Sequence, residues 1–174
     1  HQSAMQALLL GRTLIGERCY DVMRVIDVLD EFDCIDSNKI ACMGNSGGGT
    51  TTFFASCLDE RIQVSMPSGY VCEPEYSIAA MHHCQCNYIP SFSKYFSLSD
   101  ISCLIAPRPL VIVAGDEDPI FPLVGTKKAF EGISKIYEKC NSPSQCRLII
   151  GHGGHRFYAQ EAYPVFNLFM ESLK

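Results

Sequence analysis

The sequence predicts an α/β fold built on a parallel sheet, and three observations lead to that fold class. Segments with the periodicity of helices alternate four times with short apolar runs typical of strands. The run 110–114 is continuously apolar and largely β-branched, as expected for a strand buried on both faces of a parallel sheet. Glycine-rich or acidic turns follow several of these runs, at the sheet edge where ligands bind in such folds.

The first half of the chain opens with residues 1–10, which are poorly specified. Residues 12–32 carry apolar side chains at steps of three and four, which predicts a long helix. The apolar run 39–44 ends in small residues and is expected to form a strand. Residues 51–58 are expected to form the next helix, and the apolar run 62–66 the next strand.

The second half begins with an irregular stretch, residues 71–100, which is interpreted as a binding or lid-like excursion. A short helix is expected at 100–106, because Pro107 and Pro109 stop it. The remaining elements are expected to be a strand at 110–114, a helix at 122–140 with apolar residues at helical spacing, a strand at 146–150 and a closing helix at 159–173.

The composition favours a single globular domain, residues 1–174. The chain has 174 residues, of which 47% are apolar, enough for a substantial core. A net charge of -5 argues against a nucleic-acid or anionic-membrane surface as partner. No apolar run approaches the roughly 20 residues that a membrane helix needs.

The ten cysteines raise the question of redox compartment. Disulfides are one interpretation. Several cysteines, however, lie inside apolar runs: Cys42 in an expected strand, and Cys19 and Cys57 in expected helices. Free cysteine behaves there as a small buried hydrophobe. We therefore expect reduced thiols and a cytoplasmic location.

The sequence Gly44-Asn45-Ser46-Gly47-Gly48 fits the pattern Gly-x-Ser-x-Gly between an expected strand and an expected helix. A serine in such a sharp turn is exposed as a nucleophile, and the glycines relieve the crowding that the turn creates. A glycine–serine turn without chemistry is the alternative. The nucleophile interpretation gains weight only if an acid and a histidine follow in order.

An acid and a histidine do follow, each just past a later strand. The acid is Asp116, Glu117 or Asp118, and the base is His152 or His155. A serine needs a histidine to take its proton and a carboxylate to orient that histidine. The order serine, acid, histidine is that of α/β-hydrolases. The backbone N–H of Gly47 is then the expected first oxyanion donor.

Seven segments carry a resemblance to a known family: residues 7–16, 21–22, 44–50 (Gly-Asn-Ser-Gly-Gly-Gly-Thr), 83–90 (His-Cys-Gln-Cys-Asn-Tyr-Ile-Pro), 105–110, 118–122 (Asp-Pro-Ile-Phe-Pro) and 153–157 (Gly-Gly-His-Arg-Phe). In these segments, which cover nearly the whole chain, the protein resembles the α/β-hydrolase group of acetyl xylan esterases and dienelactone-hydrolase-like proteins. The resemblance implies that Asp118 is the acid and His155 the base. Ser91 is a departure, since relatives tend to have glycine there.

The resemblance also implies that the chain supplies only the last four strands of an eight-stranded fold, with flanking helices. The second oxyanion donor would then lie upstream of residue 1. We expect a missing N-terminal half or a homo-oligomer as partner, because the first strand, around 39–44, would have a bare edge that can pair with another chain.

Several further side chains are candidates for the same site. Tyr70, Tyr88 and Phe121 are candidate substrate-binding aromatics, with core packing as the alternative. The cluster of residues 82–86 (His-His-Cys-Gln-Cys) contains zinc-type ligands, but their spacing is too tight for four ligands on one ion. We therefore expect a wall of the pocket there rather than a metal site.

These observations together predict a serine carboxylic-ester hydrolase that removes an acetyl or other small acyl group from a small-molecule or carbohydrate ester. Ser46, Asp118 and His155 are the expected catalytic residues. We expect no cofactor, no metal, no nucleic-acid partner and no membrane association. The alternatives are a serine peptidase of the prolyl-oligopeptidase type and an inactive truncated hydrolase that acts as a binding module.

Overall fold

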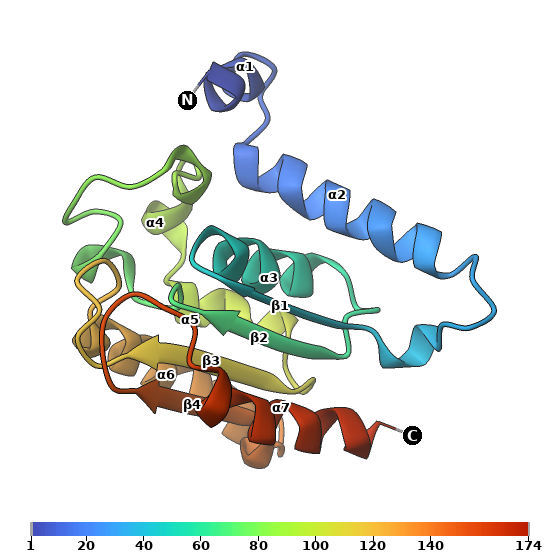
Figure 1. Ribbon diagram of the computed structural model, residues 1–174. Coiled ribbons are helices and arrows are strands. Elements are labelled where there is room, and N and C mark those ends of the chain that lie inside the picture. Colours follow the sequence, from blue (N-terminus) through green and yellow to red (C-terminus); the bar gives the residue numbers. More distant parts are fainter. Residues whose placement is uncertain (1, 174) are drawn as a thin grey trace.

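The computed structural model describes residues 2–173 and contains a four-stranded, fully parallel sheet (Figure 1). Along the sheet the strands follow their order in the sequence: β1 (Ala41–Asn45), β2 (Val64–Ser68), β3 (Leu110–Gly115) and β4 (Cys146–Gly151). The α/β class and the parallel sheet predicted from the sequence are confirmed. All four strands end at the same edge, so the turns after them share one side of the molecule.

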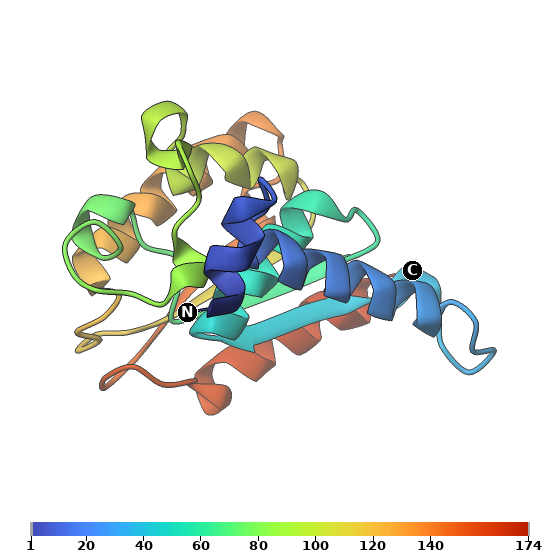
Figure 2. The same cartoon turned by 90° about the horizontal axis from the view of Figure 1, so that it is seen from above.

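Seven α-helices are found in the described residues: α1 (Gln2–Leu9), α2 (Leu14–Leu29), α3 (Gly47–Leu58), α4 (Phe92–Tyr95), α5 (Leu98–Ile101), α6 (Leu123–Lys139) and α7 (Ala159–Ser172). Seen from above, α1 and α2 run across the top of the molecule and α1 lies beside the excursion after β2 (Figure 2). The segment 1–10, poorly specified by its sequence, is largely this helix α1.

Alternate residues of β3 point into two separate cores. Leu110 and Ile112 pack with Phe53 of α3 and Ile133 of α6 on one face of the sheet. Val111, its neighbour in β3, packs with the residues of α7 on the other face. Continuous apolar sequence in β3 is therefore explained by burial on both faces, as predicted.

Helix α2 packs on α3, outside the sheet. Ile15, Cys19 and Ile26 form one stripe of α2 and share a cluster with Ala55 of α3 and Ile62. Thr13 caps the start of the helix by accepting a hydrogen bond from the Gly16 N–H at 3.1 Å. The predicted helix 12–32 is correct in kind but extends beyond both ends of α2.

Strand β2 lies two residues later than the predicted strand 62–66. Proline rarely occurs within a central strand, because it lacks an N–H to donate to the neighbouring strand. In the structure β2 continues through Pro67, which is opposite Gly44, and ends with Ser68 opposite Asn45. The shift matters because it brings Ser68 to the level of the Ser46 turn.

Residues 71–100 form the predicted irregular excursion, with two 3₁₀ turns followed by α4 and α5. The predicted helix 100–106 is wrong at both ends. Ser97 and Asp100 form a capping box that begins α5 at Leu98, and α5 ends at Ile101, before a 3₁₀ turn. Ser91, noted as a departure from glycine, has φ 63° in the left-handed region. Glycine adopts that region without steric cost, which gives the preference of relatives a physical reason.

No helix among residues 2–173 combines the length and the apolar character that crossing a membrane requires.

Candidate active site

Ser46 lies in the sharp turn between β1 and α3. Its backbone angles, φ 58° and ψ −120°, are rare for a residue with a side chain and cost on the order of 1–3 kcal/mol. The Ser46 N–H donates to the Ser68 carbonyl at 2.9 Å, which ties the turn to the end of β2. A Cβ on Gly44 would lie 2.5 Å from the carbonyl carbon of Gly48, so the turn requires glycine there. The predicted strand, turn and helix are all present.

The start of α3 presents backbone N–H groups beside Ser46. Gly47 is the first residue of α3, and an N–H at this position has no acceptor within the helix. Thr50 holds the Ser46 carbonyl through its N–H at 2.9 Å. The helix dipole adds partial positive charge at this end. The Gly47 N–H is therefore free to bind an oxygen of a ligand.

Asp118 is held in a tight turn after β3, with a side chain only 1% exposed. Its Oδ1 accepts the backbone N–H groups of Ile120 at 2.8 Å and Phe121 at 3.0 Å. Its Oδ2 accepts from Nδ1 of His155 at 2.7 Å. Both carboxylate oxygens thus accept hydrogen bonds. The carboxylate is held in one orientation, and that orientation in turn orients the His155 ring.

His155 follows β4 and turns its ring toward β2. With Asp118 accepting at Nδ1, the proton of the neutral ring is on Nδ1 and the lone pair is on Nε2. Nε2 is buried and has no hydrogen-bond partner within residues 2–173. Gly69, at the end of β2, makes room for the ring, since a Cβ there would lie 3.0 Å from Cε1 of His155. The ring also stacks on Phe121 at 5.7 Å.

The structure brings Asp118 and His155 together but shows no hydrogen bond between His155 and Ser46. The Ser46 turn is bonded to Ser68, and the His155 ring lies against Gly69, the next residue. Both candidates therefore lie at the end of β2. Catalytic hydrogen bonds are often long without substrate and tighten when it binds.

The alternative acid and base form a second pair on the surface. His152 and Asp116 are joined at 3.0 Å, with side chains 84% and 36% exposed, and Asp116 also accepts the Gly153 N–H at 2.8 Å. The hydrogen bond to Asp116 raises the pKa of His152, and the bond to His152 lowers the pKa of Asp116. The backbone N–H of Glu117 donates to the Gly153 carbonyl at 2.9 Å. The buried pair is thus Asp118 with His155.

The three candidate aromatics differ in exposure. Tyr70 and Phe121 are each 3% exposed and contact each other edge to face at 5.7 Å, within the core that supports His155. Tyr88 is 45% exposed. Tyr88 and Tyr70 line an apolar cavity of about 430 Å³ together with Phe54, Ile78 and Phe92. Only Tyr88 offers much of its ring to a ligand.

A buried network in the excursion joins the turns of Ser46 and Asp118, and its members were not identified as a unit from the sequence. Thr50 donates to Asn87 at 3.0 Å, and Asn87 lies 3.5 Å from Nδ1 of His83. Nε2 of His83 lies 3.0 Å from the Ser77 hydroxyl, which donates to the Ile120 carbonyl at 2.6 Å. Since the Ser77 hydroxyl donates to Ile120, it accepts from Nε2–H of a neutral His83. Burial lowers the pKa of His83, in agreement with this state.

The rest of the 82–86 cluster packs around this network. Cys86 is buried, and its Sγ lies 3.0 Å from Sγ of Cys84. Within the described part of the chain, no three histidine, cysteine or acidic side chains are placed to hold a metal ion. All ten cysteines are free thiols in the structure.

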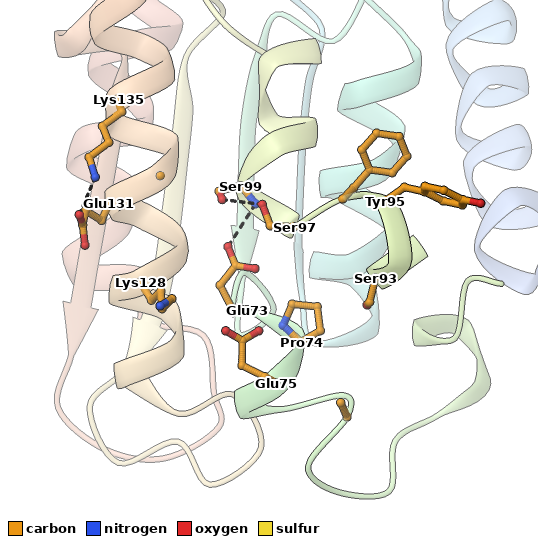
Figure 3. A pocket seen from close by; sticks show the side chains of 13 residues that line it. Glu73, Pro74, Glu75, Ser93, Tyr95, Ser97, Ser99, Lys128, Glu131 and Lys135 are labelled. Carbon is orange, nitrogen blue, oxygen red and sulfur yellow. Dashed lines mark hydrogen bonds and ion pairs between the residues drawn. The ribbon is translucent and has the colours of Figure 1, made fainter. Parts of the chain in front are cut away.

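The largest cavity described, about 760 Å³, lies between the excursion and α6 (Figure 3). Glu73 is 4% exposed there and accepts the N–H groups of Leu98 and Ser99 at 3.3 and 3.4 Å. Lys135 pairs with Glu131 across one turn of α6. None of the lining residues belongs to the Ser46, Asp118 and His155 set. The candidate site is therefore identified by its serine, acid and histidine side chains and not by the size of the cavity.

Comparison with known proteins gives a match along most of the chain. The family model described as Abhydrolase family matches residues 3–161. YtaP of Bacillus subtilis (strain 168), a protein provisionally named a hydrolase, is 28% identical over 153 residues, covering 86% of this chain and 51% of YtaP. The chain spans about half the length of the curated relative it matches.

Solved structures share the fold at low sequence identity. A glucuronoyl esterase of carbohydrate esterase family 15 from Caldicellulosiruptor kristjansonii is similar with a TM-score of 0.69 and 21% identity, covering 87% of this chain and 47% of the esterase. A protein from Bacteroides fragilis provisionally named an acetyl xylan esterase is similar with a TM-score of 0.68 and 20% identity, covering 93% and 40%. These likenesses concern the fold.

Proposed function

The chain belongs to the Abhydrolase family, and from this premise we propose that it is a serine carboxylic-ester hydrolase acting through an acyl-enzyme. The observation that carries the proposal is the buried Asp118–His155 pair at 2.7 Å with its unpaired Nε2. This pair lies at the sheet edge where the strained turn exposes Ser46. The arrangement supports a serine, histidine and acid acting as one unit.

In the proposed reaction Nε2 of His155 takes the Ser46 proton while Oγ attacks the acyl carbonyl carbon. The imidazolium that forms is stabilised by Asp118, whose carboxylate already accepts from Nδ1. His155 then gives the proton to the leaving alcohol oxygen as the ester bond breaks. Water, deprotonated by the same Nε2, attacks the acyl-enzyme. The acid is released as the acyl bond to Ser46 Oγ breaks and His155 returns the proton to Oγ. Gly47 N–H stabilises the oxyanion in both halves of the reaction.

We propose a carbohydrate ester with a small acyl group, such as acetyl, as the substrate class. The support is the fold shared with a glucuronoyl esterase and with a provisionally named acetyl xylan esterase. Tyr88, exposed beside the 430 Å³ cavity, is the aromatic side chain that the substrate would contact. Hydrolysis of acetylated xylan oligosaccharides, compared with methyl esters of glucuronic acid, separates the two ester types.

We further propose that the protein works in a reducing compartment such as the cytoplasm and pairs through the outer edge of β1. Ten free cysteines, several of them buried, support the first point. Strand β1 is at the end of the sheet and has β2 as its one neighbour among the described residues, so the backbone groups of its other edge are unpaired. Light scattering at micromolar concentration should show a dimer, and a monomer would contradict this pairing.

Labelling by a fluorophosphonate and hydrolysis of p-nitrophenyl acetate test the function. Both are expected in the unmodified chain and should be lost in Ser46→Ala. Hydrolysis of proline-containing peptide amides with little ester hydrolysis would favour a peptidase instead. Absence of labelling in a folded chain would favour a binding module without catalysis.

A further inference from the structure

Arg18 brings a positive charge to the turn that carries Ser46. It lies in the first half of α2, whose N-terminal end is on the same side of the molecule as the start of α3 (Figure 1). A Cβ built on Gly47 would lie 3.3 Å from Nη1 of Arg18, so the guanidinium lies beside the residue that follows Ser46. Burial raises the pKa of the Cys86 thiol to about 11, and the nearby Arg18 cation opposes that rise.

Arg18 differs from the other arginines in residues 2–173 because nothing there pairs with it. Three of the others form ion pairs with carboxylates and three donate to backbone carbonyls: Arg12, Arg24 and Arg61, and Arg108, Arg147 and Arg156. Arg18 has neither kind of contact within the described residues, although its side chain is half-buried. A cation that has lost part of its hydration without gaining a partner binds an arriving anion strongly.

An anion arises at this place during ester hydrolysis. When Ser46 attacks, the carbonyl oxygen becomes negative and must be met by hydrogen-bond donors near the nucleophile. Gly47 N–H is one such donor, and the guanidinium beside Gly47 presents several N–H groups in a planar fork. A donor that meets charge only as it develops stabilises the transition state more than the bound ester.

We infer that the Arg18 guanidinium is the second oxyanion donor of this site, acting beside the Gly47 N–H. The inference rests on the proposed serine-esterase function and deepens it. No bond or proton moves on Arg18: the negative charge forms on the acyl oxygen when Ser46 adds, and it returns to the carbonyl when the alcohol leaves. The resemblance to α/β-hydrolases implies a donor upstream of residue 1, and Arg18 offers one within residues 2–173.

The glycine at position 47 has a specific role in this arrangement. The 3.3 Å distance is tighter than an ordinary Cβ contact, so an alanine side chain would press on Nη1 of Arg18. An alanine at position 47 would therefore displace the guanidinium by a few tenths of an ångström from its place beside the start of α3. A helix that starts with three consecutive glycines, Gly47 to Gly49, gains little from intrinsic propensity, which fits a functional reason for the first of them.

The test is Arg18→Gln, assayed with p-nitrophenyl acetate. Loss of one oxyanion donor predicts a fall of about 100-fold in kcat with KM changed by less than about threefold. Arg18→Lys should retain an intermediate rate, because an ammonium keeps the charge but not the planar fork. Added guanidinium ion at millimolar concentration should partly restore Arg18→Ala, a rescue that a merely structural role would not give.

Matched variants decide what a negative result means. Arg24→Gln, on the same helix but paired with Asp27, should retain the full rate. If Ser46→Ala loses activity while Arg18→Gln keeps its kcat, the inference is overturned and the esterase function stands. If Ser46→Ala keeps the activity of the unmodified chain, the esterase function itself fails. A rise in KM confined to an anionic ester such as a succinate monoester, with kcat unchanged, would assign Arg18 to substrate charge and overturn the oxyanion role.

Discussion

Two histidine–aspartate pairs lie side by side in the loops after β3 and β4. They consist of the same residue types but differ in exposure and in hydrogen bonding. His155 and Asp118 are 17% and 1% exposed and are joined at 2.7 Å. His152 and Asp116 are 84% and 36% exposed and are joined at 3.0 Å. The buried pair leaves Nε2 shielded and unpaired, whereas the other ring stands in solvent.

The comparison shows that a histidine beside an aspartate is not sufficient for a catalytic site. The burial and the other hydrogen bonds of the pair also matter. Oδ1 of Asp118 accepts hydrogen bonds from two backbone N–H groups, which fixes the direction in which Oδ2 points. Asp116 instead bonds the Gly153 N–H and thereby joins the two loops. The surface pair therefore braces the loop, and the buried pair is placed to move a proton.

The largest expected difference concerns the two histidines. His155→Gln should lower kcat for p-nitrophenyl acetate by about 10⁴-fold or more, because the general base is lost. His152→Gln should stay within about twofold of the unmodified chain. Steady-state kinetics of the two variants, with circular dichroism to verify folding, measure this contrast. Equal losses in both variants would break the distinction between the pairs.

The next difference concerns the two carboxylates. Asp118→Asn should cost about 10⁴-fold in kcat, because an amide cannot hold the Nδ1–H tautomer or stabilise the imidazolium. Asp116→Asn should retain most activity, since its carboxylate bonds only the loop and His152. Rates of fluorophosphonate labelling provide an independent measurement. A more severe loss for Asp116→Asn would transfer the acid role to the surface pair.

A smaller effect is expected from His83, which supports the buried pair through Phe121. The His83 ring lies 5.2 Å from Phe121, which stacks on His155. His83→Gln should lower kcat about tenfold with little change in KM, because a displaced base aligns poorly with substrate. His82→Gln, in an exposed neighbour, is the control and should be neutral.

His83→Gln should also change how the stability of the protein depends on pH. The pKa of His83 is lowered from 6.5 in the folded state, so below pH 6.5 the unfolded chain binds the proton first. The unmodified chain should therefore lose stability as pH falls below 6.5. His83→Gln should lack that part of the loss in thermal unfolding. Identical pH profiles for both proteins would contradict a buried neutral His83.

The smallest effect belongs to the surface pair. Because the pKa of His152 is raised above 6.5 and that of Asp116 is lowered below 3.8, the pair is fully charged between these values. Its contribution should vanish as pH rises through the His152 pKa or falls through the Asp116 pKa. At such exposure, salt screening should hold the change in Tm for His152→Ala to about 1 °C. A larger change would show that the surface pair is structurally essential.

Much of this arrangement was predictable from the sequence because it depends on local rules. Periodicity and β-branching placed the four strands, and Gly-x-Ser-x-Gly placed the turn of Ser46. The resemblance to α/β-hydrolases favoured Asp118 and His155, the pair that the fold buries. The strand predicted at 62–66 was placed two residues too early, because the apolar run begins before β2, which covers Val64–Ser68.

Other features could not be predicted, since they depend on contacts between distant segments. Ser77, His83 and Asn87 join only when the excursion folds over Thr50. The spacing of the sequence contains no trace of that network. Arg18 could not be assigned to the site from the sequence, because its place beside Gly47 follows from how α2 packs on α3.

The most direct test of the account is peptide-level mass spectrometry after brief reaction with p-nitrophenyl acetate. The account predicts an acetyl group on Ser46 in the unmodified chain and in His152→Gln. It predicts none on Ser46 in His155→Gln over the same interval. An acetyl group on another residue, or equal acetylation of Ser46 in both histidine variants, would contradict the claim that the buried pair activates Ser46.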